Sequence, residues 1–373
     1  MAEIASSAIL SVAQEVESQY RADLDDIMME KKSGVSLTDT RIIKGIVLNK
    51  ELVHPGMPKR VENAKIALLS SALEVKKTEF DAKINIESPE QMEAFLHQEE
   101  NMLKTMVNKI AEKGANVLVC QKGIDDVAQH FLARKGILAV KQAKESDMEK
   151  LAKATGAKVV DTLEDMTKRD LGHAGLVEER KIGDDKMTFI EECKDPRSVA
   201  ILIRGGTERI VDEAERSIHD ALCVARDVVQ EPKIVAGGGA PEMEVARALK
   251  QYAETLPGRE QLAVQRFAEA MEAVPLTLGE NAGLDPIDIL SELRARHEKG
   301  ETWAGVGVHE GKVQNMTELE VYEPLAVKKQ IIKSATEAAC MILKVDDVIA
   351  AGKMRAPPAP SKGLPETEYE GEE

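Results

Sequence analysis

The hydrophobic and polar positions of the chain alternate between two kinds of segment in residues 115–165. Short apolar runs such as ANVLVC and ILAV are separated by amphipathic segments such as IDDVAQHFLARKG and SDMEKLAKATG. Short apolar runs are typical of buried strands, and a repeat of three to four residues is typical of helices. The pattern therefore predicts a β-α-β-α-β region, and with it an α/β domain.

Further apolar or alternating runs extend this α/β region on both sides. They predict strands over 24–33, 42–53, 65–73, 186–193 and 198–206. An amphipathic N-terminal stretch predicts a helix over 1–19. A longer helix is expected over 87–114, where Ser88 can cap the start, Pro89 suits the first turn and Gly114 fits the end. A shorter one is expected to be capped by Ser146 and closed by Gly156.

From Thr207 onward the pattern becomes helical. The expected helices are 207–230, 241–255, 259–273, 286–299 and 324–342, and Asp285 is expected to cap the fourth of these, with Pro286 as its first residue. The second half is therefore predicted to be mainly α. The tail 351–373 is rich in proline and acidic residues, which predicts disorder.

A run of three glycines, Gly237, Gly238 and Gly239, separates the strand-like Ile234–Ala236 from a helical segment. Glycines in such a place let the backbone take positive φ and come unusually close to another group. The start of a helix also offers free N–H groups to an anion or a nucleotide. A tight turn or helix cap explains the run equally well.

Composition excludes several functions. With 373 residues the chain can form two or three domains, and its net charge of −16 argues against general nucleic-acid binding. No apolar run is long enough for a membrane span, and the N-terminus lacks the features of a secretory signal. The four cysteines form no CxxC pair, which favours reduced thiols in the cytoplasm, and the scattered histidines suggest no metal site.

Nearly the whole chain resembles the group II chaperonins, the archaeal thermosome and its eukaryotic cytosolic relatives. The matching stretches include HPGMPKRVENAKIALL, GANVLVCQKGIDDVAQHFLARKGILAV, LIRGGTE, AGGGAPE, GREQLAVQRFAEA and ENAGLDPIDIL. The resemblance implies an ATP-dependent chaperone subunit that binds and encloses unfolded proteins in a double ring of identical or homologous subunits, with ATP and magnesium as cofactors.

The resemblance also implies nested domains, with the α/β region in the middle. Residues 1–41 and 204–230 would form an intermediate domain, and 42–203 an apical domain whose helical protrusion is 87–113. Residues 231–350 would form the C-terminal half of an equatorial domain. A family subunit begins with a further equatorial segment that carries a GDGTT motif for magnesium. GDGT does not occur in this sequence, so the chain is expected to lack that segment, and ATP hydrolysis by it is uncertain.

Seven residues match the family's nucleotide site. Asp220 corresponds to the catalytic aspartate, a general base or water-positioning group, although a carboxylate on a helix is usually only a solvated one. The nucleotide-contacting residues would be Gly237, Gly238, Gly239, Gly305, Val306 and Glu323. Glu323 could instead be an acidic residue that stabilises the start of a helix before Pro324.

The protrusion is a candidate surface for unfolded proteins. Its residues Met92, Phe95 and Leu96 fall at helical spacing, and Val127 and Phe131 on the next helix could also face a client. An ordinary apolar face that packs on its own domain is the more conservative interpretation. A module that holds unfolded chains without ATP turnover is the alternative function. No nucleophile, base or metal cluster suggests an unrelated α/β enzyme.

Overall fold

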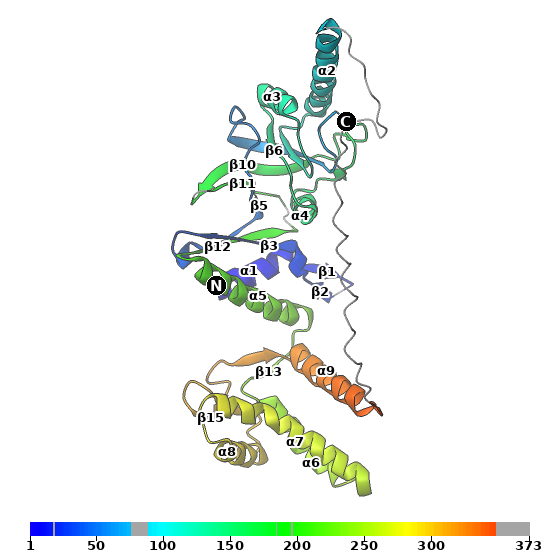
Figure 1. Cartoon of the computed structure of the whole chain (residues 1–373). Coiled ribbons are helices and arrows are strands. Elements are labelled where there is room, and N and C mark those ends of the chain that lie inside the picture. Colours follow the sequence, from blue (N-terminus) through cyan, green and yellow to red (C-terminus); the bar gives the residue numbers. More distant parts are fainter. Residues whose placement is uncertain (18, 76–88, 184, 195–196, 348–373) are drawn as a thin grey trace, which may run out of the picture. The chain divides into compact units, whose positions relative to one another are not determined.

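The computed structural model describes residues 1–17, 19–75, 89–183, 185–194 and 197–347. Ser88 and the tail expected to be disordered, 351–373, lie outside these ranges. Contacts divide the chain into two units, Met1–Ala326 and Val327–Glu373. The chain is a mixed α/β protein, as the sequence predicts, with sheets in the first unit and a long helix running into the second (Figure 1).

The α/β region forms a seven-stranded sheet within the described residues, in the order β5-β11-β10-β6-β7-β8, with β9 paired to the end of β6. The strands are β5 (Gly45–Leu48), β6 (Arg60–Leu69), β7 (Val117–Cys120), β8 (Leu138–Val140), β9 (Val159–Val160), β10 (Gly172–Ile182) and β11 (Asp185–Glu191). Its helices are α2 (Pro89–Lys113), α3 (Asp126–Arg134) and α4 (Glu145–Thr155). The β-α-β-α-β prediction is confirmed.

Both faces of this sheet are covered, because its strands alternate apolar side chains between two cores. In β7, Val117 and Val119 pack in one cluster with Leu151 of α4. Leu118 and Cys120 pack in the other with residues of α2 and α3. This two-sided burial explains the continuous apolar runs that the sequence shows here.

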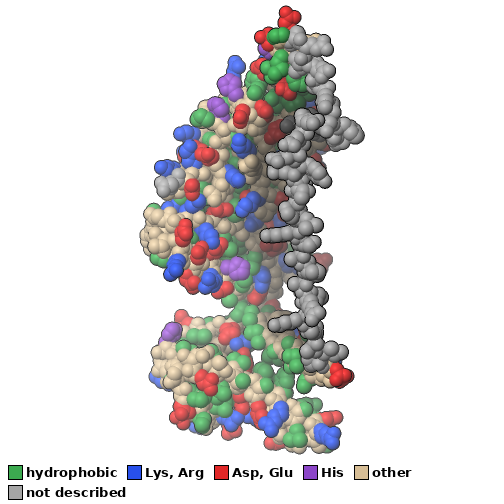
Figure 2. Space-filling model, viewed as in Figure 1, with side chains coloured by type: hydrophobic (Ala, Val, Ile, Leu, Met, Phe, Trp, Pro, Cys, Tyr) green, Lys and Arg blue, Asp and Glu red, His purple; other side chains and the backbone are tan. Residues whose placement is uncertain are grey.

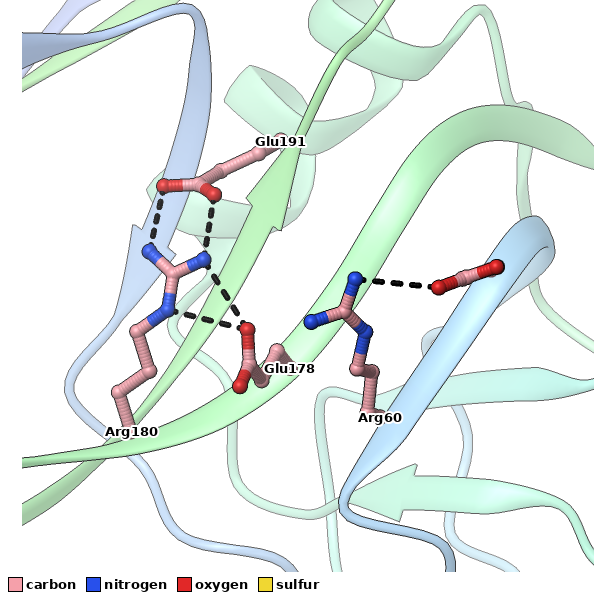
Figure 3. Close-up of polar contacts among 5 residues, drawn as sticks. Arg60, Glu178, Arg180 and Glu191 are labelled. Carbon is pink, nitrogen blue, oxygen red and sulfur yellow. Dashed lines mark hydrogen bonds and ion pairs between the residues drawn. The ribbon is translucent and has the colours of Figure 1, made fainter.

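Strand β10 is one of several strands that the sequence analysis missed. Its second half reads Glu178-Glu179-Arg180-Lys181, which does not look like a strand. The structure pairs these charges across the sheet: the Arg180 guanidinium donates to both carboxylate oxygens of Glu191 at 2.7 and 2.8 Å and to Glu178 at 3.1 Å (Figure 3). It also lies 4.8 Å from the centre of the Phe189 ring. Arg60 and Glu62 on β6 form a further pair at 3.0 Å.

A second, three-stranded sheet has the order β3-β12-β4. It consists of β3 (Ile27–Ser33), β12 (Val199–Gly205) and β4 (Arg41–Ile43), and it packs on α1 (Ala2–Val12) and α5 (Glu208–Gln230). Two 3-10 turns, η1 (Leu24–Asp26) and η2 (Leu37–Asp39), flank β3. Strand β12 thus shares a sheet with β3 although the expected apical range includes it. The boundaries of the expected domains remain predictions.

Three local expectations are wrong. The N-terminal helix ends at Val12 rather than at 19, and the polar residues beyond it form an exposed hairpin of β1 (Gln14–Val16) and β2 (Gln19–Arg21). The expected strand 42–53 is split between two sheets at Gly45, whose φ is +147° and whose Cβ, if present, would overlap the Ile190 carbonyl. Helix α4 starts at Glu145, so Ser146 lies inside the helix and is not its cap.

The remaining part of the first unit combines helices with two small sheets. The helices are α6 (Ala240–Ala253), α7 (Gly258–Asn281) and α8 (Pro286–Glu298). Strand β13 (Ile234–Ala236) pairs with β16 (Tyr322–Pro324), and β14 (Ala304–Gly307) pairs with β15 (Lys312–Asn315). Asp285 caps α8 as predicted, accepting from the Ile287 and Asp288 amides. Helix α9 (Leu325–Leu343) runs into the second unit.

Candidate functional site

Backbone hydrogen bonds bring the predicted glycine segment against two strands that are distant in sequence. The Gly237 amide donates to Val321 O at 3.0 Å, and the Val306 amide donates to Gly238 O at 2.8 Å. Antiparallel pairing places Glu323 opposite Val235. The structure therefore assembles most of the residues predicted to contact a nucleotide in one place: Gly237, Gly238, Gly239, Gly305, Val306 and Glu323.

The three glycines are required by the packing of the protein itself. Gly238 and Gly239 have φ of +64° and +76°, in the left-handed region that side chains disfavour. A Cβ on Gly238 would lie 2.9 Å from the Val306 amide nitrogen, and one on Gly239 would lie 2.7 Å from Pro275 Cβ. The predicted close approach and positive φ are confirmed. The groups approached are β14 and α7, and the role of the glycines toward a nucleotide stays a prediction.

The two candidates on β14 differ in what they can present. A Cβ on Gly305 would meet Gly237 O at 2.8 Å and Gly238 O at 3.0 Å, so this glycine lets β14 lie directly on the loop. Val306 is 2% exposed and its side chain packs in an apolar cluster with Met243 and Val313. Only the backbone of Val306 is therefore available to line a base.

The Glu323 side chain lies next to Gly237, the first residue of the glycine segment. Its Oε1 is 3.2 Å from the position that a Gly237 Cβ would occupy, and its side chain is half-buried. It is a strand residue, and α9 begins two positions later at Leu325. A carboxylate here can accept hydrogen bonds from a sugar hydroxyl, and its place just ahead of α9 is also compatible with the alternative interpretation.

Asp220 lies on α5 and has no contact with the glycine loop or with Glu323 among the interactions of the described residues. Its side chain is exposed and makes no hydrogen bond or ion pair with the residues that the structure describes. Helix α5 ends at Gln230, four residues before β13 begins at Ile234. The helix therefore links the three-stranded sheet to the glycine loop through a short connection.

A buried ion cluster fixes the helices behind the site. The Glu272 carboxylate on α7, with a side chain only 6% exposed, accepts from Lys250 Nζ of α6 at 2.6 Å and from Arg294 Nη2 of α8 at 2.5 Å. Burial alone would raise the pKa of Glu272, but the two cations outweigh it and hold that pKa below its usual range. One carboxylate thus ties three helices together.

The sequence analysis did not single out the residues that support the loop. Glu244 and Arg247 show an ordinary i, i+3 charge pattern, and His297 is a lone histidine on a helix. The bond that joins His297 to Glu244 spans 53 positions of the chain, so neither spacing nor composition could have found it. Trp303, the chain's one tryptophan, sits beside Tyr322 in an edge-to-face contact at 6.3 Å between ring centres.

The cleft beside Trp303 is distinct from the glycine loop. It has a volume of about 520 Å³ and is lined by Trp303, Lys312 and Glu318 among others, but by none of the candidate nucleotide residues. Its cation Arg296 is already bound to Glu292 at 2.7 Å. We therefore assign the candidate site to the glycine loop and not to this cleft.

The candidate client residues fall into two groups by exposure. Met92, Leu96 and Val127 are 47%, 54% and 42% exposed, whereas Phe95 is half-buried. Figure 2 shows apolar and acidic side chains together at the free end of α2. Phe131 is only 9% exposed and packs in the core with Leu132, so its side chain belongs to the domain interior.

The second half of α2 is anchored to the α/β region. Leu103, Val107 and Ile110 are at most 3% exposed and belong to the core beneath the helix. Lys109 also bonds Glu164 at 2.8 Å. The conservative interpretation of an apolar packing face is therefore correct for this half, and the first half of α2 carries the exposed apolar residues.

In the described ranges, no group of three or more His, Cys, Asp or Glu side chains is arranged to hold a metal ion. None of the helices there is both long and apolar enough to cross a membrane. The glycine loop and Glu323 fit the sugar and base of a nucleotide, and we assign no ligands for magnesium.

Comparison with known proteins places these features in context. Residues 1–353 match the model of the TCP-1/cpn60 chaperonin family. A thermosome subunit of Methanopyrus kandleri is 58% identical over 354 residues, which cover 95% of this chain and 65% of the relative. A thermosome subunit of Pyrococcus horikoshii is 56% identical over 372 residues, covering 100% and 68%. The chain thus spans about two thirds of the length of these relatives.

A solved structure agrees with the sequence relatives. The open-state monomer of a group II chaperonin from Methanococcoides burtonii superposes with a TM-score of 0.70 and is 43% identical. The match covers 92% of this chain and 79% of that one. At this identity the likeness supports a shared fold for the matched residues.

Proposed function

The chain belongs to the TCP-1/cpn60 chaperonin family, and from this membership we propose that it works as part of an ATP-dependent group II chaperonin subunit that binds and encloses unfolded proteins. The observation that carries the proposal is the convergence of Gly237, Gly305 and Glu323 on one loop. We propose the cytoplasm as its location, as the reduced-thiol interpretation of the cysteines suggests.

The loop would take the adenosine half of ATP. Gly237, Gly238 and Gly305 would contribute the backbone contacts to the base, and the Glu323 carboxylate would accept a ribose hydroxyl. Bound ATP would supply the phosphoanhydride bond that is hydrolysed. Asp220 would orient or deprotonate the attacking water. Because this carboxylate lies on a separate helix, it could act only after that helix has moved toward the nucleotide.

Client binding is proposed for the exposed half of α2. Met92 and Leu96 lie one turn apart on a helix whose other end is fixed in a core. Methionine and leucine on a rigid helix suit contact with varied apolar segments. These exposed side chains also favour the second candidate function, a module that holds unfolded chains without ATP turnover.

Association with identical or homologous subunits is proposed from the C-terminal helices. Tyr252 on α6 and Leu262 on α7 are 56% and 60% exposed, and Phe267 is 38% exposed. Exposed apolar side chains that gather on a protein surface favour association with another protein. We propose that the partners are subunits of the same family, arranged in a double ring.

Replacing Met92 and Leu96 with serine tests the client proposal. We expect the double variant to need at least about 30-fold more protein for the same suppression of aggregation of an unfolded client, because each of the two lost contacts removes roughly 1–2 kcal/mol of apolar burial. Light scattering of a denatured client diluted into the protein measures this effect. The matched control is Ala94→Ser with Gln98→Ser, two exposed positions on the same helix half.

Two results would contradict the client proposal. If the double variant protects the client as well as the unchanged protein does, the contact surface lies elsewhere. If the control loses as much protection, the effect comes from weakening the helix and not from the apolar side chains. Circular dichroism of both variants verifies that the domain is folded.

A further inference from the structure

His297 is a buried histidine whose two ring nitrogens are both engaged. It lies near the end of α8 and is 1% exposed. Nδ1 is 2.9 Å from the Glu244 Oε2 on α6, and Nε2 is 2.9 Å from the carbonyl oxygen of Ala304, the first residue of β14. The ring thus bridges two elements that are distant in sequence.

Both partners of His297 are hydrogen-bond acceptors. The Ala304 carbonyl has no proton to donate, and Arg247, which bonds the Glu244 carboxylate, holds the pKa of that carboxyl below its usual range. A neutral imidazole carries one N–H and can make only one of these two bonds. Both bonds form together only when the ring carries both protons.

The two elements joined by His297 are those that build the glycine loop. Helix α6 starts at Ala240, directly after Gly239, and Glu244 lies in its second turn. Strand β14 holds the loop through the bond from the Val306 amide to Gly238 O at 2.8 Å. A contact that fixes β14 against α6 therefore also fixes the distance between Gly305 and the glycine segment.

We propose that His297, held as the imidazolium, is a positioning residue that clamps β14 to α6 and so sets the shape of the loop for nucleotide binding. The clamp is a property of this chain's own residues. Its consequence for nucleotide affinity rests on the proposed function.

The charged groups around the ring set the pH range of the clamp. Glu244 of α6 bonds the ring, and Arg247 of α6 bonds Glu244; nearby on α8, Arg294 pairs with Glu272 of α7 and Arg296 pairs with Glu301 in the loop before β14. The clamp is complete while Glu244 is ionised and the ring is doubly protonated. Arg247 favours the ionised Glu244 that the clamp needs, and the clamp is lost in strong acid as Glu244 becomes protonated.

NMR of ring nitrogens in isotope-labelled histidine tests the protonation state directly, on the full chain. His297→Gln identifies the signals of His297 among the seven histidines. We expect both ring nitrogens of His297 to be protonated at about pH 7, because each faces a hydrogen-bond acceptor. A single protonated nitrogen at that pH would overturn the proposal.

A second variant keeps the test decisive if His297→Gln does not fold. Glu244→Gln retains the ring but removes the anionic acceptor, and we expect His297 then to lose one proton at about pH 7. An unchanged imidazolium in Glu244→Gln would contradict the assigned role of the carboxylate. Trp303, next to Ala304, should show an emission step that coincides with the His297 titration and is missing in His297→Gln.

Nucleotide binding separates this inference from the function on which it rests. We expect ADP to bind about ten-fold more weakly to His297→Gln, and equally weakly to the unchanged protein once the ring has lost its proton. An imidazolium signal without ADP binding would leave the clamp supported and refute the proposed function. Equal ADP affinity in both proteins would overturn the positioning role of His297.

Discussion

Replacing Gly239 with alanine is expected to lower the free energy of unfolding of the C-terminal region by about 2–5 kcal/mol. The residue has φ of +76°, which costs an L-residue roughly 1–2 kcal/mol. Its new methyl group would also lie 2.7 Å from Pro275 Cβ and 3.0 Å from Pro275 Cα, and such overpacking costs about 1–3 kcal/mol. Urea unfolding followed by the emission of Trp303, which lies in the same region, measures the change.

Gly283→Ala is the matched control for this measurement. Gly283 has nearly the same φ, +75°, but a Cβ there would meet nothing within 4 Å. Its replacement should cost only the backbone part, about 1–2 kcal/mol. Equal losses in the two variants would show that α7 does not press on the glycine loop and that the loop is held in another way.

Replacing Glu272 with alanine is expected to destabilise the same region by about 1–3 kcal/mol. The substitution removes the buried carboxylate that bonds Lys250 and Arg294, whose own side chains are 37% and 47% exposed, so water partly compensates the two cations that remain. Urea unfolding through Trp303 reports the loss. Glu292→Ala is the control, because Glu292 is an exposed residue of α8 that bonds Arg296 one turn away and not the Glu272 cluster.

The pH dependence of this contribution has a definite sign. The folded state lowers the pKa of Glu272, so its stabilising effect is complete above the pKa of an unfolded glutamate and disappears as the pH falls through the folded value. The difference between the unchanged protein and Glu272→Ala should therefore shrink in acid. A difference that stays constant down to low pH, or one under about 1 kcal/mol at neutral pH, would contradict the assigned role.

The sequence predicted those parts of the fold whose pattern is local. The buried strands β7 and β8 and the helices α3 and α5 follow directly from apolar runs and helical spacing. Strand β10 was missed because its charged Arg180 is paired with Glu178 on the same strand and with Glu191 on the neighbouring β11. Such pairing is set by the sheet register and is not visible in one segment.

The candidate site shows the same division. The glycine run itself predicts positive φ and a close approach, and both are found. The groups approached, Pro275 and Val306, and the bridge from His297 to Ala304 depend on tertiary packing. The exposure of Met92 beside the burial of Leu103 on one helix likewise depends on where α2 leaves its domain.

The central claim is that the glycine loop and Glu323 bind the adenosine half of a nucleotide, and ADP titration followed by Trp303 emission tests it most directly. Trp303 is the chain's only tryptophan and touches Tyr322, the neighbour of Glu323. We predict a saturable change with ADP, competition by adenosine, and about ten-fold weaker binding in Glu323→Ala but not in Glu318→Ala. No saturable change, or equal affinity in the two variants, would contradict the claim.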